Sequence, residues 1–375
     1  MKRSIAILST GFALFSMFFG SGNLVFPITV GEQSAGHYGF AALGILLTGV
    51  IVPFLGVFAM VLYNGNLPNF FRLFGAKGTF IFSFLALALM GPFGVLARCL
   101  TVAHGASLLL MPKLSLPVAS LFFCMIIFIF SFNKSSLLSR LGLFLTPFLL
   151  FSIAMIAFFG FKAGSFPISV EGTKWSALKM GFFQGYQTMD LLAAFFFSHF
   201  VIAQLKKEQT DQQIVLRPTL LSHFCQSALV GGALLAIVYF ALVLLGWLYS
   251  PLLIEVAPQK RLGVIATEAL GSFAAPIVCV AIILACMTTA IVLTSLFADF
   301  LRKNIKINHP SSLLVTLLIG FFVSTFDFAA IAKLISPILE AIYPALIALT
   351  LFNIAAFFFN KQISTSKASI KTKES

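Results

Sequence analysis

Ten apolar runs follow one another along this 375-residue sequence. A helix needs about 20 mostly apolar residues to cross the hydrocarbon core of a membrane. By this rule, we expect spans at residues 5–30, 39–63, 79–110, 116–132, 141–162, 178–203, 219–248, 264–298, 311–328 and 331–358. No soluble domain separates the runs. The sequence therefore predicts an all-α polytopic membrane protein with ten transmembrane helices.

The composition agrees with a membrane protein and excludes a soluble fold. Hydrophobic residues make up 60% of the chain and charged residues only 9%, whereas a soluble domain carries about 25% charged residues. The net charge of +13 could suggest a nucleic-acid partner. However, the basic residues stand at the ends of the apolar runs, which is the usual membrane-topology signal. We therefore expect membrane lipid as a partner and no nucleic acid.

The first apolar run is interrupted near its middle by Gly20, Ser21, Gly22 and Asn23, with Pro27 one turn later. Glycine weakens a helix by about 1 kcal/mol and proline by roughly 3 kcal/mol. We expect this helix to break inside the bilayer, where broken backbone is tolerated only if protein buries it or a wet cavity touches it. The four residues are candidate substrate ligands. The alternative is an unbroken helix whose glycines let a neighbour approach closely.

The run 178–203 contains a second interruption of the same kind. Its predicted substrate-binding residues are Gly185, Tyr186, Gln187, Thr188 and Asp190. Transporters built from inverted repeats carry interrupted helices at corresponding places in their two halves, and the substrate binds between them.

The spacing of the ten runs fits such a repeat. The broken spans come first in each set of five, and the over-long spans 79–110 and 264–298 come third. Because five is odd, the second half must be inverted relative to the first. We expect one five-helix repeat at 1–163, a second at 164–359, and a basic, unstructured cytoplasmic tail at 360–375.

The distribution of basic residues predicts the orientation. Sixteen of the 24 Lys and Arg fall on the side of the N-terminus, and eight, including Arg98, fall at the opposite ends of the spans. Because basic residues favour the cytoplasmic side, both termini are expected there.

Three separated motifs carry a family resemblance. Gly20–Pro27, Gly185–Asp190 and Ala341–Ala345 resemble, in order, the first, sixth and tenth spans of bacterial branched-chain amino acid transport system II carriers, the branched-chain amino acid:cation symporter family. The resemblance implies Na⁺- or H⁺-coupled import of leucine, isoleucine and valine across the bacterial inner membrane. It also implies a leucine-transporter-like fold. Family members usually carry about two further spans; transport is expected without them, because the five-plus-five core is present.

The resemblance further implies a Na⁺ site. Its ligands would be the carbonyls of Ser16, Phe19 and Ala285 and the hydroxyls of Thr288 and Thr289, since hard cations prefer oxygen. The alternative is that the two threonines bond to carbonyls one turn earlier in their helix. If protons drive transport instead, Asp190 and Glu340 are the candidate carriers, because ionisable residues inside a membrane are functional candidates.

An amino acid substrate carries a carboxylate, an ammonium group and an aliphatic side chain. The second half of the first span, beginning near Asn23, would offer a helix N-terminus to the carboxylate. Unwound carbonyls would receive the ammonium group, and Asp190 would either add a charge there or cap the following half-helix. Phe19, Phe26 and Met189 are candidate pocket walls. One methylene changes binding by only about 1–3 kcal/mol, so the sequence does not rank the three substrates.

No enzyme motif appears in the sequence. It contains neither H-E-x-x-H nor a G-x-x-x-x-G-K-[ST] loop, and no C-x-x-C among its five cysteines. We expect no enzyme and no cofactor besides the coupling ion. A proton-coupled symporter of the same fold for another small amino acid or amine is the alternative, and an intramembrane lipid enzyme is a more distant one. A homo-oligomer is left open.

Overall fold

A computed structural model describes residues 2–132, 137–164, 172–211 and 217–371, and within them the side chains except at 2, 3, 5, 137–146, 204–211, 217–220, 272–275 and 360–371. Every regular element in these ranges is helical. The α-helices are α1 (Lys2–Phe18), α2 (Ser21–Glu32), α3 (Tyr38–Leu46), α4 (Val52–Leu62), α5 (Leu67–Phe70), α6 (Gly75–Met90), α7 (Val95–Ser107), α8 (Leu116–Phe132), α9 (Leu137–Ala163), α10 (Lys174–Tyr186), α11 (Asp190–Asp211), α12 (Arg217–Leu248), α13 (Ser250–Leu253), α14 (Arg261–Ile305), α15 (His309–Ser324) and α16 (Asp327–Lys371). A π-helical turn, η1 (Leu47–Ile51), joins α3 to α4, and two short 3₁₀ turns are η2 (Arg72–Phe74) and η3 (Pro258–Lys260).

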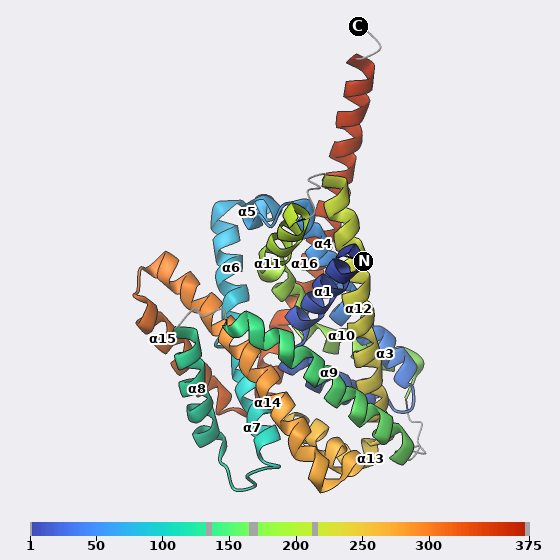
Figure 1. The fold of residues 1–375 in the computed structure, drawn as a ribbon, viewed down its shortest axis with the longest axis vertical. Helices are drawn as coiled ribbons and strands as arrows, with labels where there is room; N and C mark the ends of the chain where they lie inside the picture. Colours follow the sequence, from blue (N-terminus) through green and yellow to red (C-terminus); the bar gives the residue numbers. More distant parts are fainter. Residues whose placement is uncertain (1, 133–136, 165–171, 212–216, 372–375) are drawn as a thin grey trace.

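The helices form a bundle whose members run mostly between two ends (Figure 1). Within the described residues, five helical stretches are long and apolar enough to cross a membrane, or seven if each of two bent pairs counts as one span. Three shorter apolar helices accompany them: α8, α15 and the part of α9 at 147–163. The protein is therefore a multi-pass helical membrane protein.

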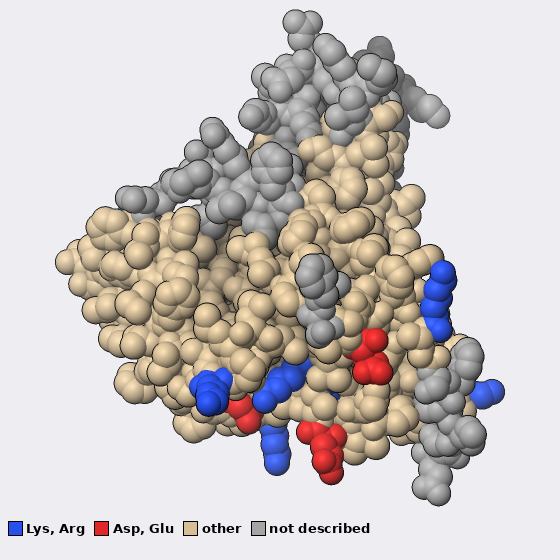
Figure 2. Space-filling view, turned by 60° about the horizontal axis from the view of Figure 1, so that its bottom comes forward, with Lys and Arg blue, Asp and Glu red and all other residues tan. Residues whose placement is uncertain are grey.

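The outer surface of the bundle fits a lipid environment. Large apolar side chains such as Phe151, Leu229 and Leu334 are 64%, 74% and 72% exposed. In Figure 2, the charged side chains in view gather toward the end of the molecule that carries α13, and most of the described surface above them is uncharged in this view. This separation places the charges where a membrane protein meets water.

The two bent pairs lie in the two interrupted apolar runs. The axes of α1 and α2 meet at 74°, and those of α10 and α11 meet at 42°. At the first bend, Gly20 adopts an extended conformation, and α2 begins at Ser21 rather than near Asn23. At the second bend, α10 ends at Tyr186, and Met189 takes a left-handed φ of 60°, which redirects the chain into α11.

The span expected over 79–110 is present as one apolar stretch at Arg72–Ser107, but it is not a continuous helix, because the structure divides it into α6 and α7. The dividing turn is Gly91-Pro92-Phe93-Gly94. Proline removes a backbone donor and disfavours helical geometry in the residue before it. The over-long run therefore reflects a turn within the span.

The expected unstructured tail is also wrong for the residues described there. Helix α16 continues to Lys371 and projects from the bundle (Figure 1). Residues 345–371 contain no glycine or proline, so no strong helix breaker stops a helix that the membrane span has already nucleated.

Candidate functional site

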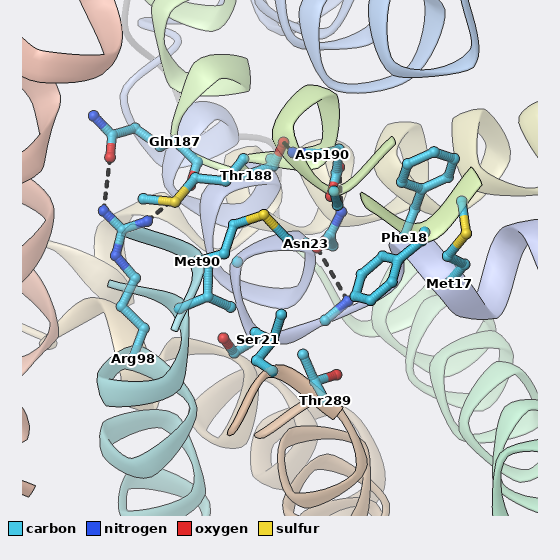
Figure 3. A pocket seen from close by; sticks show the side chains of 17 residues that line it. Met17, Phe18, Ser21, Asn23, Met90, Arg98, Gln187, Thr188, Asp190 and Thr289 are labelled. Carbon is cyan, nitrogen blue, oxygen red and sulfur yellow. Dashed lines mark hydrogen bonds between the residues drawn. The ribbon is translucent and has the colours of Figure 1, made fainter. Parts of the chain in front are cut away.

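The two breaks meet at a cavity of about 30 Å³, shown in Figure 3. This volume holds roughly two water molecules, so a larger ligand requires the surrounding helices to move apart. The lining comes from both broken spans and from α6, α7 and α14. Its residues are Met17, Phe18, Gly20, Ser21, Gly22, Asn23, Met90, Val95, Arg98, Gln187, Thr188, Met189, Asp190, Ala193, Phe197, Thr289 and Leu293.

Asn23 organises the first break. Its Oδ1 accepts a hydrogen bond of 3.1 Å from the Gly20 amide, which in a continuous helix would donate to the Ser16 carbonyl. The first amides of α2, at Ser21 and Gly22, have no acceptor within their own helix. They lie beside the cavity and carry the partial positive charge of a helix N-terminus. This end of the cavity therefore suits an anionic group.

The second break is held partly by its own turn and partly by another helix. The Met189 amide donates to the Tyr186 carbonyl at 3.1 Å, and the Thr188 hydroxyl donates to the Gly185 carbonyl at 2.9 Å. From α7, Arg98 donates to the carbonyl oxygen and to the side-chain Oε1 of Gln187, both at 2.8 Å. The conformation of this break therefore depends on a residue distant in sequence.

A buried network joins the two breaks. Asn23 Nδ2 donates to Asp190 Oδ2 at 2.7 Å and also to the Tyr239 hydroxyl. The Tyr239 hydroxyl in turn donates to the same Asp190 oxygen at 3.2 Å. All three side chains are buried. The Asp190 carboxylate thus bonds across the breaks and is not seen capping α11, which was the alternative interpretation.

Arg98 is a charged residue of the site that the sequence did not reveal. It was assigned to an outer span end, but it lies on α7 against the cavity and is only 1% exposed. Its guanidinium carbon lies 5.2 Å from the ring centre of Phe26 and 5.7 Å from that of Phe328. An arginine inside an apolar run is itself a functional signal, and the turn at 91–94 explains why its depth was misjudged.

The predicted Na⁺ ligands come from two places in the chain, the end of α1 and the helix α14. Thr289 lines the cavity, and a Cβ placed on Gly20 would stand 3.3 Å from its methyl group. The hydroxyls of Thr288 and Thr289 donate to the Ala285 carbonyl at 3.0 and 3.1 Å, which is the geometry of the alternative interpretation. Each hydroxyl oxygen keeps lone pairs that could face a cation. The carbonyls in the last turn of α1, which holds Ser16, have no amide donor within the helix. The same is true of the Phe19 carbonyl, just after the helix end.

Most of the predicted substrate ligands line the cavity, but two of them do not. Gly185 packs against Thr48 of η1, so tightly that a Cβ there would overlap the Thr48 hydroxyl. Tyr186 packs against Tyr343, with ring centres 4.6 Å apart and the rings tilted by 38°. The other seven lie at the cavity: Gly20, Ser21, Gly22, Asn23, Gln187, Thr188 and Asp190.

The apolar wall differs from the expected one. Met189 lines the cavity, whereas Phe19 and Phe26 do not. The apolar side chains that the sequence analysis did not single out are Met17, Phe18, Met90, Val95, Ala193, Phe197 and Leu293. With 46 phenylalanines in the chain, no local signal separates these residues from lipid-facing ones.

Sequence comparison relates the chain to branched-chain amino acid transport proteins. A family model described as branched-chain amino acid transport protein matches residues 3–373. A putative branched-chain amino acid carrier protein of Staphylococcus aureus (strain bovine RF122 / ET3-1) is 29% identical over 376 residues, covering 94% of this chain and 83% of the relative. Its counterpart from strain MRSA252 is 28% identical with the same coverage.

Solved structures show the same fold. The chain superposes on the inward-facing conformation of Mhp1 with a TM-score of 0.59 and 15% identity, covering 92% of this chain and 75% of Mhp1. Against Mhp1, a nucleobase-cation-symport-1 family transporter, in a closed conformation with bromovinylhydantoin bound, the TM-score is 0.63 at 14% identity, with 92% and 77% covered. This is the leucine-transporter-like fold.

Proposed function

Because the chain belongs to the family of branched-chain amino acid transport proteins, we propose that it is a secondary active transporter that imports leucine, isoleucine and valine by symport with Na⁺. The family and the fold are those of transporters, so the protein is not an enzyme. The observation that carries the proposal is the cavity between two broken spans, where Asn23 of the first bonds Asp190 of the second at 2.7 Å.

The proposed architecture is a five-plus-five inverted repeat. The five long spans, two bent pairs and three shorter helices add up to ten (5 + 2 + 3) in the described residues. Inversion exchanges the first span (α1 and α2) with the sixth (α10 and α11), and the second span (α3 and α4) with the seventh (α12). The packing agrees with this exchange, because α1 and α2 contact α12 while α10 and α11 contact α3 and α4. The repeats would be 1–163 and 164–359, with the basic tail at 360–375.

Close backbone contacts repeat in the same way. A Cβ on Gly181 of α10 would overlap the Ala41 carbonyl of α3, and one on Gly231 of α12 would lie 2.7 Å from the Gly11 carbonyl of α1. Small residues permit such close approach between membrane helices. With the basic residues on the cytoplasmic side, this arrangement would lie in the bacterial inner membrane with both termini inside.

In this proposal the cavity recognises the two charged groups of an amino acid. The free amides at the start of α2 would bind the carboxylate. The Asp190 carboxylate and the carbonyls freed at both breaks would receive the ammonium group. Phe18, Met90 and Phe197 would contact the aliphatic side chain once the helices separate enough to admit it. Because Asn23 and Tyr239 already hold Asp190, the carboxylate is positioned before the substrate arrives.

Na⁺ would bind beside the first break. Thr289 lines the cavity next to Gly20, and the carbonyls at the end of α1 would complete the site. With the Ser16, Phe19 and Ala285 carbonyls and the Thr288 hydroxyl, this gives an oxygen-only set, which a hard cation requires. In the described part of the chain, no cluster of three or more His, Cys, Asp or Glu could hold a metal, so a softer transition metal finds no comparable place there.

Uptake of labelled leucine into proteoliposomes tests the proposal. One series has a Na⁺ gradient without a proton gradient, and a second has the reverse. We expect uptake only with the Na⁺ gradient, and inhibition by unlabelled isoleucine and valine. Uptake driven only by protons would reject Na⁺ coupling and favour Asp190, which is buried and has no cationic partner among the described residues. No leucine uptake with either gradient would reject the substrate assignment.

A further inference from the structure

Arg98 is a buried cation that no described acid neutralises. It is 1% exposed, and the ion pairs recorded among the described residues do not include it. Burying an unpaired charge is costly, and inside a membrane such residues are retained for function. The stacking on Phe26 and Phe328 offsets only part of that cost, because a cation–π contact contributes modestly.

The guanidinium has donors to spare. It carries five N–H groups, and the hydrogen bonds recorded for it use one on each terminal nitrogen, both directed to Gln187. The Nε atom is buried without a partner. The remaining donors belong to a rigid planar group whose geometry matches a carboxylate. Arg98 can therefore hold the second break and still bind an anion.

Asp190 supplies the opposite charge on a different side of the same cavity. Figure 3 shows Arg98 and Asp190 entering from separate helices, α7 and α11, with Thr188 between them. Neither forms an ion pair with the other. A cavity with one buried charge of each sign is complementary to a zwitterion, and an α-amino acid is the zwitterion that this family would carry.

The position of Arg98 also relates it to the helix N-terminus. The thiol of Cys99, the next residue on α7, contacts the Ser21 hydroxyl at 3.3 Å. Phe26, one turn along α2, stacks on the guanidinium. Arg98 thus runs beside the first turn of α2, where the free amides lie.

From this geometry, we propose that Arg98 binds the carboxylate of the transported amino acid, together with the amides at the start of α2. The inference rests on the proposed function and adds a specificity-determining residue to it. It predicts that the protein rejects amines and amides that share the aliphatic side chain of leucine. The competing explanation is that Arg98 only holds the Gln187 carbonyl in place.

Binding of labelled leucine to the purified full chain, with leucinamide as competitor, separates the two explanations. Leucinamide keeps the ammonium group and side chain but lacks the carboxylate. We expect the wild type to prefer leucine by on the order of 100-fold, as for a buried charge pair. Arg98→Gln should lower this ratio at least tenfold by weakening leucine alone. Arg302→Gln, an exposed arginine on α14, is the matched control and should keep the ratio.

Gln187→Glu is the sharper variant. It keeps an acceptor for Arg98 but adds a carboxylate of the protein that pairs with the guanidinium. If Arg98 binds the substrate carboxylate, this pairing should cause a similar loss of preference for leucine. A purely structural role predicts an unchanged or higher leucine affinity. Arg98→Lys, which keeps the charge without the planar fork, should retain part of the preference and covers the case that Arg98→Gln does not fold.

Three results would overturn the inference. First, equal affinity of the wild type for leucinamide and leucine would overturn the inference without any variant. A preference that survives in both Arg98→Gln and Gln187→Glu would leave Arg98 with the structural role only, while leucine binding and uptake would still support the proposed function. A wild type that binds no leucine would reject the proposed function and this inference with it.

Discussion

The two broken spans interrupt their helices by different means. At the first break, an extended Gly20 and the side chain of Asn23, three residues away, define the conformation. At the second, a buried non-glycine residue, Met189, holds a left-handed φ of 60°, and Arg98 of α7 fixes the Gln187 carbonyl, two residues earlier. The left-handed conformation is unfavourable for such a side chain and persists only where the surroundings impose it. The first break is therefore encoded locally, whereas the second depends on the assembled bundle.

The largest expected effect comes from closing the first break. A Cβ on Gly22 would lie 3.3 Å from the Phe26 ring and 3.5 Å from the Thr188 backbone, so Gly22→Leu would crowd both breaks and the cavity. We expect leucine uptake to fall by roughly 100-fold, as when a site is displaced by about an ångström, with the protein still present in the membrane. Gly39→Leu is the control, because a Cβ there meets nothing within 4 Å. Wild-type uptake by Gly22→Leu would contradict a site at this break.

A smaller effect is expected from removing the charge that links the breaks. Asp190→Asn keeps an acceptor for Asn23 and Tyr239 but loses the carboxylate, so the breaks should keep their geometry while the ammonium group loses its partner. We expect the apparent leucine affinity to weaken by about 30-fold, measured by equilibrium binding. Asp327→Asn is the control, since this exposed residue only caps α16 through the Ala330 amide. Equal leucine affinity in both variants would remove Asp190 from the substrate site.

The smallest effect is expected beside the first break. Thr289→Val removes one of the proposed Na⁺ ligands and should raise the half-saturating Na⁺ concentration by about tenfold, without changing the preference among leucine, isoleucine and valine. Thr267→Val, in the part of α14 before its kink at Gly271, loses an equivalent hydroxyl bond to the Gly263 carbonyl and should leave Na⁺ dependence unchanged. An unaltered half-saturating concentration in Thr289→Val would exclude this hydroxyl from the ion site.

The contrast between the breaks also explains what the sequence reveals. The first break was recognised because Gly20, Gly22 and Asn23 disfavour a helix by themselves. Residues of the second break were recognised by composition. Composition did not reveal that Gly185 and Tyr186 would face away from the cavity, because their packing depends on Thr48 and Tyr343. Arg98 was misplaced because an apolar run does not reveal a turn inside it. The ten apolar runs could be read directly, as each is a local property of composition.

The hydrogen bond between Asn23 and Asp190 has a thermodynamic consequence. It ties the break beside the proposed ion site to the break beside the proposed substrate site, so a ligand that favours one arrangement of the pair favours it for both. Equilibrium linkage then requires reciprocity: whatever factor Na⁺ contributes to leucine affinity, leucine must contribute to Na⁺ affinity. In a symporter, that shared factor makes it rare for either solute to cross the membrane without the other.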